Sequence, residues 1–528
     1  MAGGDAREGR PGREARAPSK TPSGAAGARR GASVLVRGGL LVDGGGAPAR
    51  RADLLVQDGL VAAIGDAIKA PEGALVFEAA GAVVSPGFVD AHSHDDAALL
   101  EPEGSAAKLS QGVTAVVAGN CGLSLAPWTP SEGRPLPPPP LNLLGGPGRF
   151  SFGSFAAYLE ALRSGSAEDR APGEDAIPRA AGRAPRPRAA VLAGHSSLRA
   201  ARVADLGGPA RPDELKDMIR DLEEGLESGL AGFSGGLAYP ASIGAPASEA
   251  AALAKAAFSR GKVFALHIRN EYEGMWDALD EAFAIAREAL GGSPEPGARL
   301  VLSHQKCAGP SNRGRSAELL ERVERAARDI PLAFDAYPYE AGSTLLEAES
   351  VRASRRVLVT WSEPHPELAG LELGEAAARL GLRAEAAIGE LSPASAAYFH
   401  MDGADVEAIL SHPLCMVGSD GLPNDARPHP RLYGAFPRFF ARFVRERRLL
   451  TLEEAVRKAS SLPASVFGLP GGVLAPGAPA DLVVFRPEAI EAGSDWAEPR
   501  GTAKGIDLVL VGGAPALGGA SLRDPRGR

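Results

Sequence analysis

Short apolar runs alternate with amphipathic segments through the middle of the chain. There are eight of these runs, and in order they read GFVDAHSH, GVTAVVAGN, RAAVLAGHS, GLAGFSGG, KVFALHIR, RLVLSHQK, IPLAFDAY and PLCMVGSD. Nearly continuous apolar runs are typical of parallel strands that are buried on both faces. The segments between them carry apolar residues at helical spacing, as in DELKDMIRDLEEGLES. This alternation predicts an α/β protein with a (β/α)8 barrel, and an open doubly wound sheet is the alternative.

The two ends of the chain have a different pattern. Short β-like runs bounded by glycine turns occur near both termini, for example SVLVRGGLLVDG and GIDLVLVGG. We therefore expect residues 33–85 and 471–528 to form a small sheet module beside a barrel over residues 86–470. Residues 340–405 separate the seventh and eighth strands and carry helical patterns, which predicts a lid insertion over the barrel mouth.

Composition excludes several classes of protein. Hydrophobic residues make up 45% and charged residues 23% of the 528 residues, as in ordinary globular proteins. The net charge of −8 and the lack of a dominant basic patch argue against nucleic acid as a partner. No apolar run approaches the roughly 20 residues that span a membrane. Composition leaves the oligomeric state open.

The N-terminal segment and the cysteines indicate a reducing compartment. Residues 1–32 are rich in Arg, Gly, Ala and Pro, lack the apolar core of a secretory signal, and are expected to be a disordered tail. The three cysteines, Cys121, Cys307 and Cys415, are too few and too scattered for a disulfide framework. We therefore predict a cytoplasmic protein, in which Cys307 and Cys415 are small buried hydrophobes.

Six polar residues stand where the apolar runs end. In chain order they are His92, His94, Cys121, His267, His304 and Asp420. In a barrel the carboxyl ends of all strands meet at one face, so these side chains are expected to converge there. Imidazole, thiolate and carboxylate ligands together suit Zn²⁺, and the thiolate argues against magnesium or calcium.

The same six residues can be divided between two metal positions. Cys121, as a thiolate, could bridge them, with His267 and His304 completing one position. The other position would use the remaining two histidines and Asp420. The sequence thus predicts a bound Zn²⁺ and leaves room for a second metal position.

The other histidines are expected to play different parts. His195 also ends a strand, and a structural role is at least as well supported for it as a role near the metal. His412 and His429 precede prolines in loops and are expected to be turn residues. His365 and His400 lie in the predicted lid and are expected to be solvated.

Zinc at a barrel mouth predicts hydrolysis of an amide or a related C–N bond. The ion lowers the pKa of bound water to about 7 and polarises a carbonyl. Asp420 can take a proton from that water and return it to the departing amine. Polar residues of the neighbouring loops are candidates for holding a substrate carboxylate. Each could equally well be a polar residue of the protein surface or pack behind the site. The candidates are Arg427, Arg431, Tyr337, Tyr339, Ser343 and Thr344.

The motifs resemble those of one enzyme family. The stretches PGFVDAHSHDD, GVTAVVAGNCGLSLAP, GHSSLR, GLAYP, SHQKCAG, DAYPYEAGST and GSDGLPNDARPHPRLYGAFPR resemble the N-acyl-D-amino-acid deacylases (D-aminoacylases) of the amidohydrolase superfamily. The resemblance covers about residues 33–487. It implies a barrel joined to a β-sandwich from both termini, zinc as cofactor, and a small N-acylated D-amino acid as substrate. The preference for D-substrates comes only from the resemblance.

The resemblance also implies a role for each motif residue. Cys121 would be the bridging ligand, His267 and His304 would complete the tight zinc site, and Asp420 would be the catalytic acid and base. The implied second site consists of His92, His94 and Asp420. The implied substrate-binding residues are Arg431, Tyr337, Ser343 and Tyr239.

The chain departs from the family pattern in its substrate loops. Gln305 replaces a histidine that the family often has beside the ligand, and the loop after Tyr239 is altered. These departures leave the metal residues intact and concern the binding of the substrate's side chain.

Two other functions compete with deacylation. A cyclic-amide hydrolase, such as a hydantoinase or dihydroorotase, commonly bridges two metals with a carboxylated lysine on the fourth strand, and GFSGGLAYP contains no lysine. A non-catalytic binding protein on a decayed barrel would usually have lost a ligand or the general base, and all six positions are filled.

Overall fold

The computed structural model describes residues 33–101, 103–164, 185–292 and 295–523. The predicted N-terminal tail, residues 1–32, lies outside the described residues. The described residues form one compact unit.

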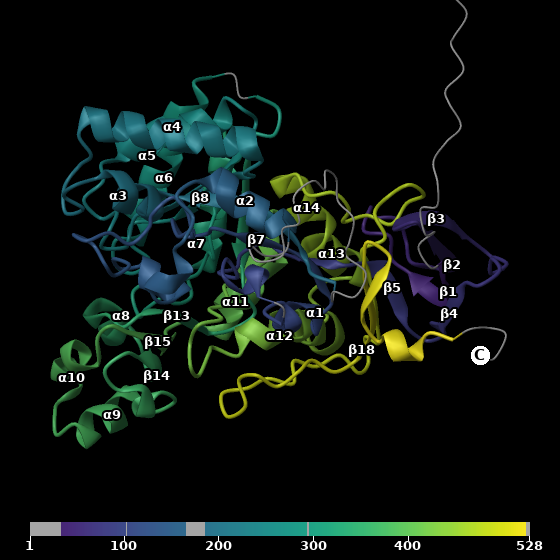
Figure 1. Ribbon diagram of the computed structural model, residues 1–528. Coiled ribbons are helices and arrows are strands. Elements are labelled where there is room, and N and C mark those ends of the chain that lie inside the picture. Colours follow the sequence, from purple (N-terminus) through teal and green to yellow (C-terminus); the bar gives the residue numbers. More distant parts are fainter. Residues whose placement is uncertain (1–32, 102, 165–184, 293–294, 524–528) are drawn as a thin grey trace, which may run out of the picture. The chain divides into compact units, whose positions relative to one another are not determined.

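Eight parallel strands form the barrel (Figure 1). They pair in chain order and comprise β6 (Phe88–Asp90), β7 (Val113–Ala118), β8 (Arg188–Gly194), β9 (Gly232–Gly236), β10 (Val263–His267), β11 (Arg299–Leu302), β12 (Leu332–Ala336) and β16 (Cys415–Val417). The first and last strands meet where the amide of Ala91 donates to the carbonyl of Val417 at 3.1 Å. The barrel prediction is confirmed, and the open sheet is wrong.

Strand side chains alternate between two apolar environments. On β10, Val263 and Ala265 join the cluster inside the barrel, whereas Phe264 and Leu266 join the cluster that packs against the helices. Because both faces are buried, the strands need apolar residues at successive positions. This explains why the sequence shows continuous runs rather than alternation.

Amphipathic helices surround the barrel. They include α4 (Pro212–Ser228), α5 (Ala247–Phe258), α6 (Met275–Leu290), α7 (Ser316–Ala326), α11 (Gly403–Ser411) and α13 (Leu452–Ala459). The helix predicted from DELKDMIRDLEEGLES is α4, which buries Met218, Leu222 and Leu226. Helix α13 begins after Thr451, whose hydroxyl accepts from the Glu454 amide at 3.2 Å.

Both ends of the chain contribute to a second eight-stranded sheet. It contains β1 (Val34–Leu41), β2 (Arg50–Gln57), β3 (Leu60–Gly65), β4 (Leu75–Glu78), β5 (Val83–Pro86), β17 (Leu482–Phe485), β18 (Ile506–Val511) and β19 (Ala514–Leu517). The two ends join where β5 pairs antiparallel with β17. Phe485 of β17 packs its ring against Phe88 and Phe440, which ties this terminal sheet to the barrel.

The lid between the seventh and eighth barrel strands has its own sheet. Strands β13 (Ala341–Leu345), β15 (Ala394–Phe399) and β14 (Val357–Ser362) are antiparallel, with β15 in the middle. Figure 1 shows them grouped with α8, α9 and α10, which span Ala348–Ala353, Leu373–Arg379 and Ala384–Leu391. The sequence indicated only helices here, because the strands are short and two of them, β13 and β15, carry few β-branched residues.

A further segment after β7 packs onto the barrel. It contains two 3₁₀ turns, Leu141–Leu144 and Pro147–Arg149, and the helix α2 (Phe155–Ser164). Leu141, Leu144 and Phe155 are buried, so this segment is held by apolar contacts.

None of the helices in the described ranges is both long enough and apolar enough to cross a membrane.

Candidate metal centre

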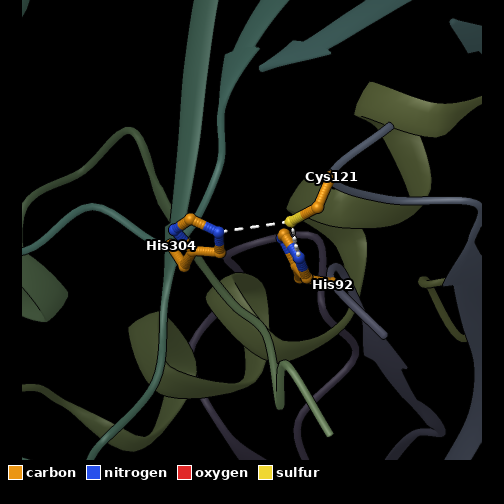
Figure 2. A group of neighbouring side chains, drawn as sticks. All are labelled: His92, Cys121 and His304. Carbon is orange, nitrogen blue, oxygen red and sulfur yellow. Dashed lines mark hydrogen bonds between the residues drawn. The ribbon is translucent and has the colours of Figure 1, made fainter. Parts of the chain in front are cut away.

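A cysteine and three histidines meet at the carboxyl ends of the strands. Figure 2 shows Cys121 between His92 and His304, with its Sγ 3.2 Å and 3.3 Å from their Nε2 atoms. The Nε2 of His304 is 3.1 Å from the Nδ1 of His267. Sulfur and nitrogen ligands of one tetrahedral zinc ion lie about 3.5 Å apart, from bond lengths of about 2.3 and 2.0 Å. The spacing of these donors therefore fits a shared cation.

Two further groups of potential ligands adjoin this cluster. Asp420 Oδ1 lies 3.2 Å from His94 Nε2 and 3.6 Å from His92 Nε2. On the opposite side, Glu271 Oε1 lies 3.1 Å from His304 Nδ1. All six residues predicted from the strand ends are thus brought together, and Glu271 joins them as a residue that the sequence analysis missed.

The backbone is strained at three of these positions. Cys121, His304 and Asp420 have φ values of 54°, 35° and 50°, in the left-handed region that disfavours residues with a Cβ. They are half of the six non-glycine residues with positive φ in the described part of the chain. Such strain costs of order 1–3 kcal/mol per residue and clusters at functional sites. Each strand end is therefore bent to aim its side chain at the cluster.

Burial and charge together fix the ionisation of the acidic groups. Burial alone would raise the pKa of the Cys121 thiol, but the charges of His92 and His304 hold that pKa well below its ordinary value. Burial likewise opposes ionisation of Asp420, but Arg431 and a hydrogen bond to His94 hold its pKa well below the ordinary range. A thiolate and a carboxylate are thus held together in a buried site.

Neighbouring anionic groups raise the pKa values of two of the histidines. Burial alone would lower the pKa of His94, but its hydrogen bonds to Asp420 and Cys121 raise it to about 9. The pKa of His304 is also raised to about 9, because Cys121 and Glu271 outweigh burial and the charge of Lys306. Positive charge at this site therefore stabilises the anionic ligands. A divalent cation would supply that charge in place of the protons on the histidines.

A buried aspartate orients two of the histidines. Asp335, on β12, lies 3.1 Å from His92 Nδ1 and accepts the backbone amide of His304 at 2.9 Å. Carboxylates in this position commonly fix the tautomer of a metal-ligating imidazole. The sequence analysis missed Asp335, although a lone carboxylate within the apolar run LAFDA was a usable signal.

A buried ion pair flanks His304. Lys306 contacts Glu271, and its Nζ lies 2.9 Å from His304 Nδ1. Lys306 is only 7% exposed. Its position two residues after a candidate ligand, in SHQK, was the signal that could have identified it.

Three of the four proposed substrate residues lie together. Arg431 is fully buried, donates to Asp420 Oδ2 at 2.9 Å and to the Ser343 carbonyl at 3.2 Å, and stacks over the Tyr337 ring at 4.5 Å. The Nε and Nη1 of Arg431 and the Oγ of Ser343 are buried without a partner. These unpaired donors mark a place where an anion can bind.

Tyr239 lies on the other side of the cluster. Its ring packs against His267, with centroids 4.9 Å apart, and its hydroxyl lies 3.1 Å from Thr344 Oγ1. Tyr239 thereby links the barrel strand end at β9 to the lid strand β13.

The remaining candidates from the loops lie elsewhere. Arg427 is exposed and donates to the carbonyl of Ala497. Tyr339 is buried against Arg438 and His429, so it packs beneath the loop instead of facing the cluster.

The histidines outside the cluster have structural partners. His195 lies 2.9 Å from Glu249, His412 lies 3.2 Å from Glu324, and His365 lies near Glu367.

Two histidines were wrongly or incompletely described by the sequence. His429 is more than a turn residue, because its Nε2 donates to the Ala341 carbonyl at 2.9 Å and so fastens the lid strand. His400 was expected to be solvated, but it is only 3% exposed. It follows β15, whose pairing with β13 and β14 carries it into the protein interior.

A small cavity of about 30 Å³ opens beside the cluster. Its wall includes His94, His267, His304 and Asp420 from the barrel and Ser343, Thr344 and His400 from the lid segment. Arg431 does not line this cavity itself but contacts two residues that do, Ser343 and Asp420.

The chain is similar to proteins of one known family. The model of the "Amidohydrolase family" matches residues 75–516. The chain is 43% identical to a D-aminoacylase of Alcaligenes xylosoxydans xylosoxydans over 91% of this chain and 94% of the relative. It is 41% identical to an N-acyl-D-aspartate deacylase of the same organism, over 91% of each chain.

A solved structure is similar over nearly the whole chain. It is the N-acyl-D-glutamate deacylase of Bordetella bronchiseptica, complexed with zinc and a phosphonate inhibitor that mimics the tetrahedral intermediate of the reaction. The TM-score is 0.83 at 41% identity, covering 94% of this chain and 97% of the other.

Proposed function

We propose that this chain, which belongs to the N-acyl-D-amino-acid deacylase (D-aminoacylase) family of the amidohydrolases, cleaves the amide bond of N-acyl-D-amino acids. The products are a D-amino acid and a carboxylate. The observation that carries this proposal is the buried thiolate of Cys121 among imidazoles, next to the unpaired donors of Arg431 and Ser343. The preference for the D-configuration follows from the relatives alone.

The residues fit zinc as the cofactor. Cys121, His267 and His304 would hold the tightly bound ion, and His92, His94 and Asp420 would form a weaker second position. The soft thiolate in this donor set favours zinc over magnesium or calcium. When bound, the ion would supply Lewis-acid polarisation of the amide carbonyl and of water.

Asp420 is proposed as the acid and base of the reaction. Its carboxylate is held ionised beside Arg431 and His94, so it can accept a proton as water attacks the carbonyl carbon. It then gives this proton to the amide nitrogen as the C–N bond breaks. The departing amine is thereby neutral, and Asp420 returns to its ionised form.

The substrate's α-carboxylate is proposed to bind Arg431, Ser343 and Tyr337. A guanidinium with two unpaired nitrogens can bind a carboxylate through a bidentate pair. Tyr239 would line the opposite side, where its ring packs against His267.

We also propose a cellular compartment and a partner for this enzyme. The three cysteines are free and buried, as expected for a protein of a reducing compartment, so we propose a cytoplasmic enzyme. Its partner would be a small N-acylated amino acid.

Turnover of N-acetyl-D-leucine and N-acetyl-L-leucine by the zinc-loaded protein tests the proposal. We expect hydrolysis of the D-enantiomer, loss of activity after chelation, and recovery when zinc is restored. Equal rates for both enantiomers, or hydrolysis that survives complete removal of the metal, would contradict it.

A further inference from the structure

The lid places an unpaired histidine in the cavity wall. His400 is 3% exposed, and its Nε2 has no hydrogen-bond partner. An unpaired buried polar atom costs about 1–3 kcal/mol, so a folded protein that retains one commonly uses it to bind a ligand. The metal cluster and the proposed carboxylate site make no use of this atom.

The ring is held by contacts on its other side. Its Nδ1 lies 3.3 Å from the hydroxyl of Tyr272, and the carbonyl of His400 accepts the amide of Gly309 at 2.9 Å. The Tyr272 hydroxyl can donate its proton to Nδ1. The proton of the neutral ring is then on Nε2, so His400 presents an N–H donor to the cavity.

His400 stays neutral in this position. Burial is the largest cause that lowers its pKa, to about 3, and the charges of Lys306, Arg431 and Arg355 act in the same direction. Glu271 opposes this shift but does not outweigh it. The ring is therefore a donor without charge at neutral pH.

The position of Nε2 identifies the part of the substrate that it meets. A Cβ built on Gly342 would lie 3.1 Å from both His400 Nε2 and the Tyr337 hydroxyl, so the two atoms flank the same space. Tyr337 is part of the proposed α-carboxylate site. The group next to that carboxylate, on the amino-acid half of the substrate, is the side chain on Cα.

The charges around this space argue against an acidic side chain. Of the described residues that line the cavity, Lys306 is the one cation of fixed charge, and it is already paired with Glu271. A second carboxylate would thus be buried without a cation of its own, which is costly. An uncharged oxygen needs only the N–H of His400.

Resting on the proposed function, we propose that His400, positioned by Tyr272, donates a hydrogen bond to an uncharged oxygen in the substrate's side chain. The preferred substrates are then N-acyl-D-amino acids with an ether or amide side chain. Aliphatic substrates of the same shape would leave the donor unpaired, and acidic substrates would add an uncompensated charge.

Two matched pairs of substrates test this directly. N-acetyl-O-methyl-D-homoserine and N-acetyl-D-norleucine differ by one oxygen in place of a methylene, and N-acetyl-D-glutamine and N-acetyl-D-glutamate differ mainly in charge. For the zinc-loaded wild type we expect kcat/KM to favour the ether over norleucine by about 3- to 10-fold, as for one neutral hydrogen bond. We expect glutamine to exceed glutamate by about tenfold or more.

Substitutions of His400 and Tyr272 test whether His400 causes the preference for the ether substrate. His400→Phe should bring the ether-to-norleucine ratio close to one, His400→Gln should retain part of it through its amide N–H, and Tyr272→Phe should reduce it. His365→Phe, at the other lid histidine, is the matched control and should leave the ratio unchanged. Zinc content should equal that of wild type in all four, and the dissociation constants of the products O-methyl-D-homoserine and D-norleucine should change in parallel.

The possible outcomes distinguish a failure of the His400 inference from a failure of the proposed deacylase function. Equal kcat/KM for ether and norleucine in wild type would overturn the inference while the deacylase proposal stands. So would a loss in His400→Phe that is uniform across all substrates, because it would place the contact at the α-carboxylate. If wild type hydrolyses no N-acyl-D-amino acid, the proposed function fails and the inference fails with it.

Discussion

At the scale of single residues, Asp420 combines three features that rarely coincide. It is buried, it is held in a left-handed backbone conformation, and it is bonded to both Arg431 and His94. Burial of a carboxylate and a left-handed backbone each cost free energy, and the contacts with Arg431 and His94 offset part of the cost of burial. A role in proton transfer accounts for all three.

Asp420→Asn should abolish proton transfer without removing the proposed tight site. We expect kcat to fall by about 10³-fold or more, since an amide cannot accept the proton. Zinc bound per chain, measured by atomic absorption, should stay close to the wild-type value. Substantial turnover in this variant would show that another group is the base.

Arg431→Lys keeps the positive charge but loses the planar pair of donors. We expect KM for N-acetyl-D-leucine to rise by about tenfold or more, because a bidentate contact to the α-carboxylate is lost. N-acetyl-D-leucinamide, which lacks that carboxylate, should be a poor substrate that this change scarcely affects. An equal effect on both substrates would indicate that Arg431 acts only through Asp420.

The candidate metal ligands could be identified from the sequence more readily than the buried residues that contact them. The six strand-end residues were found because each follows an apolar run, and the barrel brings those ends together. Asp335, Glu271 and Lys306 were missed because a single acidic or basic residue has no periodicity, and its burial depends on tertiary packing. His400 was misplaced for the same reason, since β15, the strand that leads into it, is short and has no β-branched residue.

At the scale of elements, a buried network joins the third and fifth helices. α3 (His195–Arg202) carries His195 and Arg199, and both contact Glu249 of α5. Burial alone would raise the pKa of Glu249, but the hydrogen bond and charge of His195, with Arg199, lower it to about 2. The ionised carboxylate is therefore part of how these helices pack.

Glu249 should make the free energy of unfolding depend on pH between about 4.5 and 2. Its folded pKa lies below its ordinary value of 4.5, so the stabilisation is complete above about pH 4.5 and is lost as pH falls toward 2. Glu249→Gln should lower the free energy of unfolding at pH 7 by about 2 kcal/mol. Urea denaturation at pH 7 and at pH 4 should show a smaller difference between variant and wild type at the lower pH. A difference that grows with acidity would contradict the assigned ionisation.

At the scale of the whole molecule, the terminal sheet and the barrel share an aromatic contact. Phe485 is completely buried, and its ring lies 5.7 Å from that of Phe88 and 5.1 Å from that of Phe440. The two β-rich ends could be recognised from the sequence as one module. Their attachment could not, because it depends on which aromatic residues face each other after folding.

Phe485→Ala should destabilise the sheet and the barrel together. We expect a loss of about 3–5 kcal/mol, as for other buried phenylalanines, with one unfolding transition in calorimetry. Leu60→Ala, at a residue of the same sheet that is 45% exposed, is the control and should change stability little. Two separate transitions in Phe485→Ala would mean that the terminal sheet folds independently.

The central claim is that a zinc ion is held by a thiolate at the barrel mouth. The most direct measurement is an anomalous difference map from crystals of the zinc-loaded protein, collected at the zinc absorption edge. The account predicts a strong peak within bonding distance of Cys121 Sγ and of the ring nitrogens of His267 and His304. A map with no peak at Cys121, in crystals of protein that hydrolyses N-acetyl-D-leucine, would contradict it.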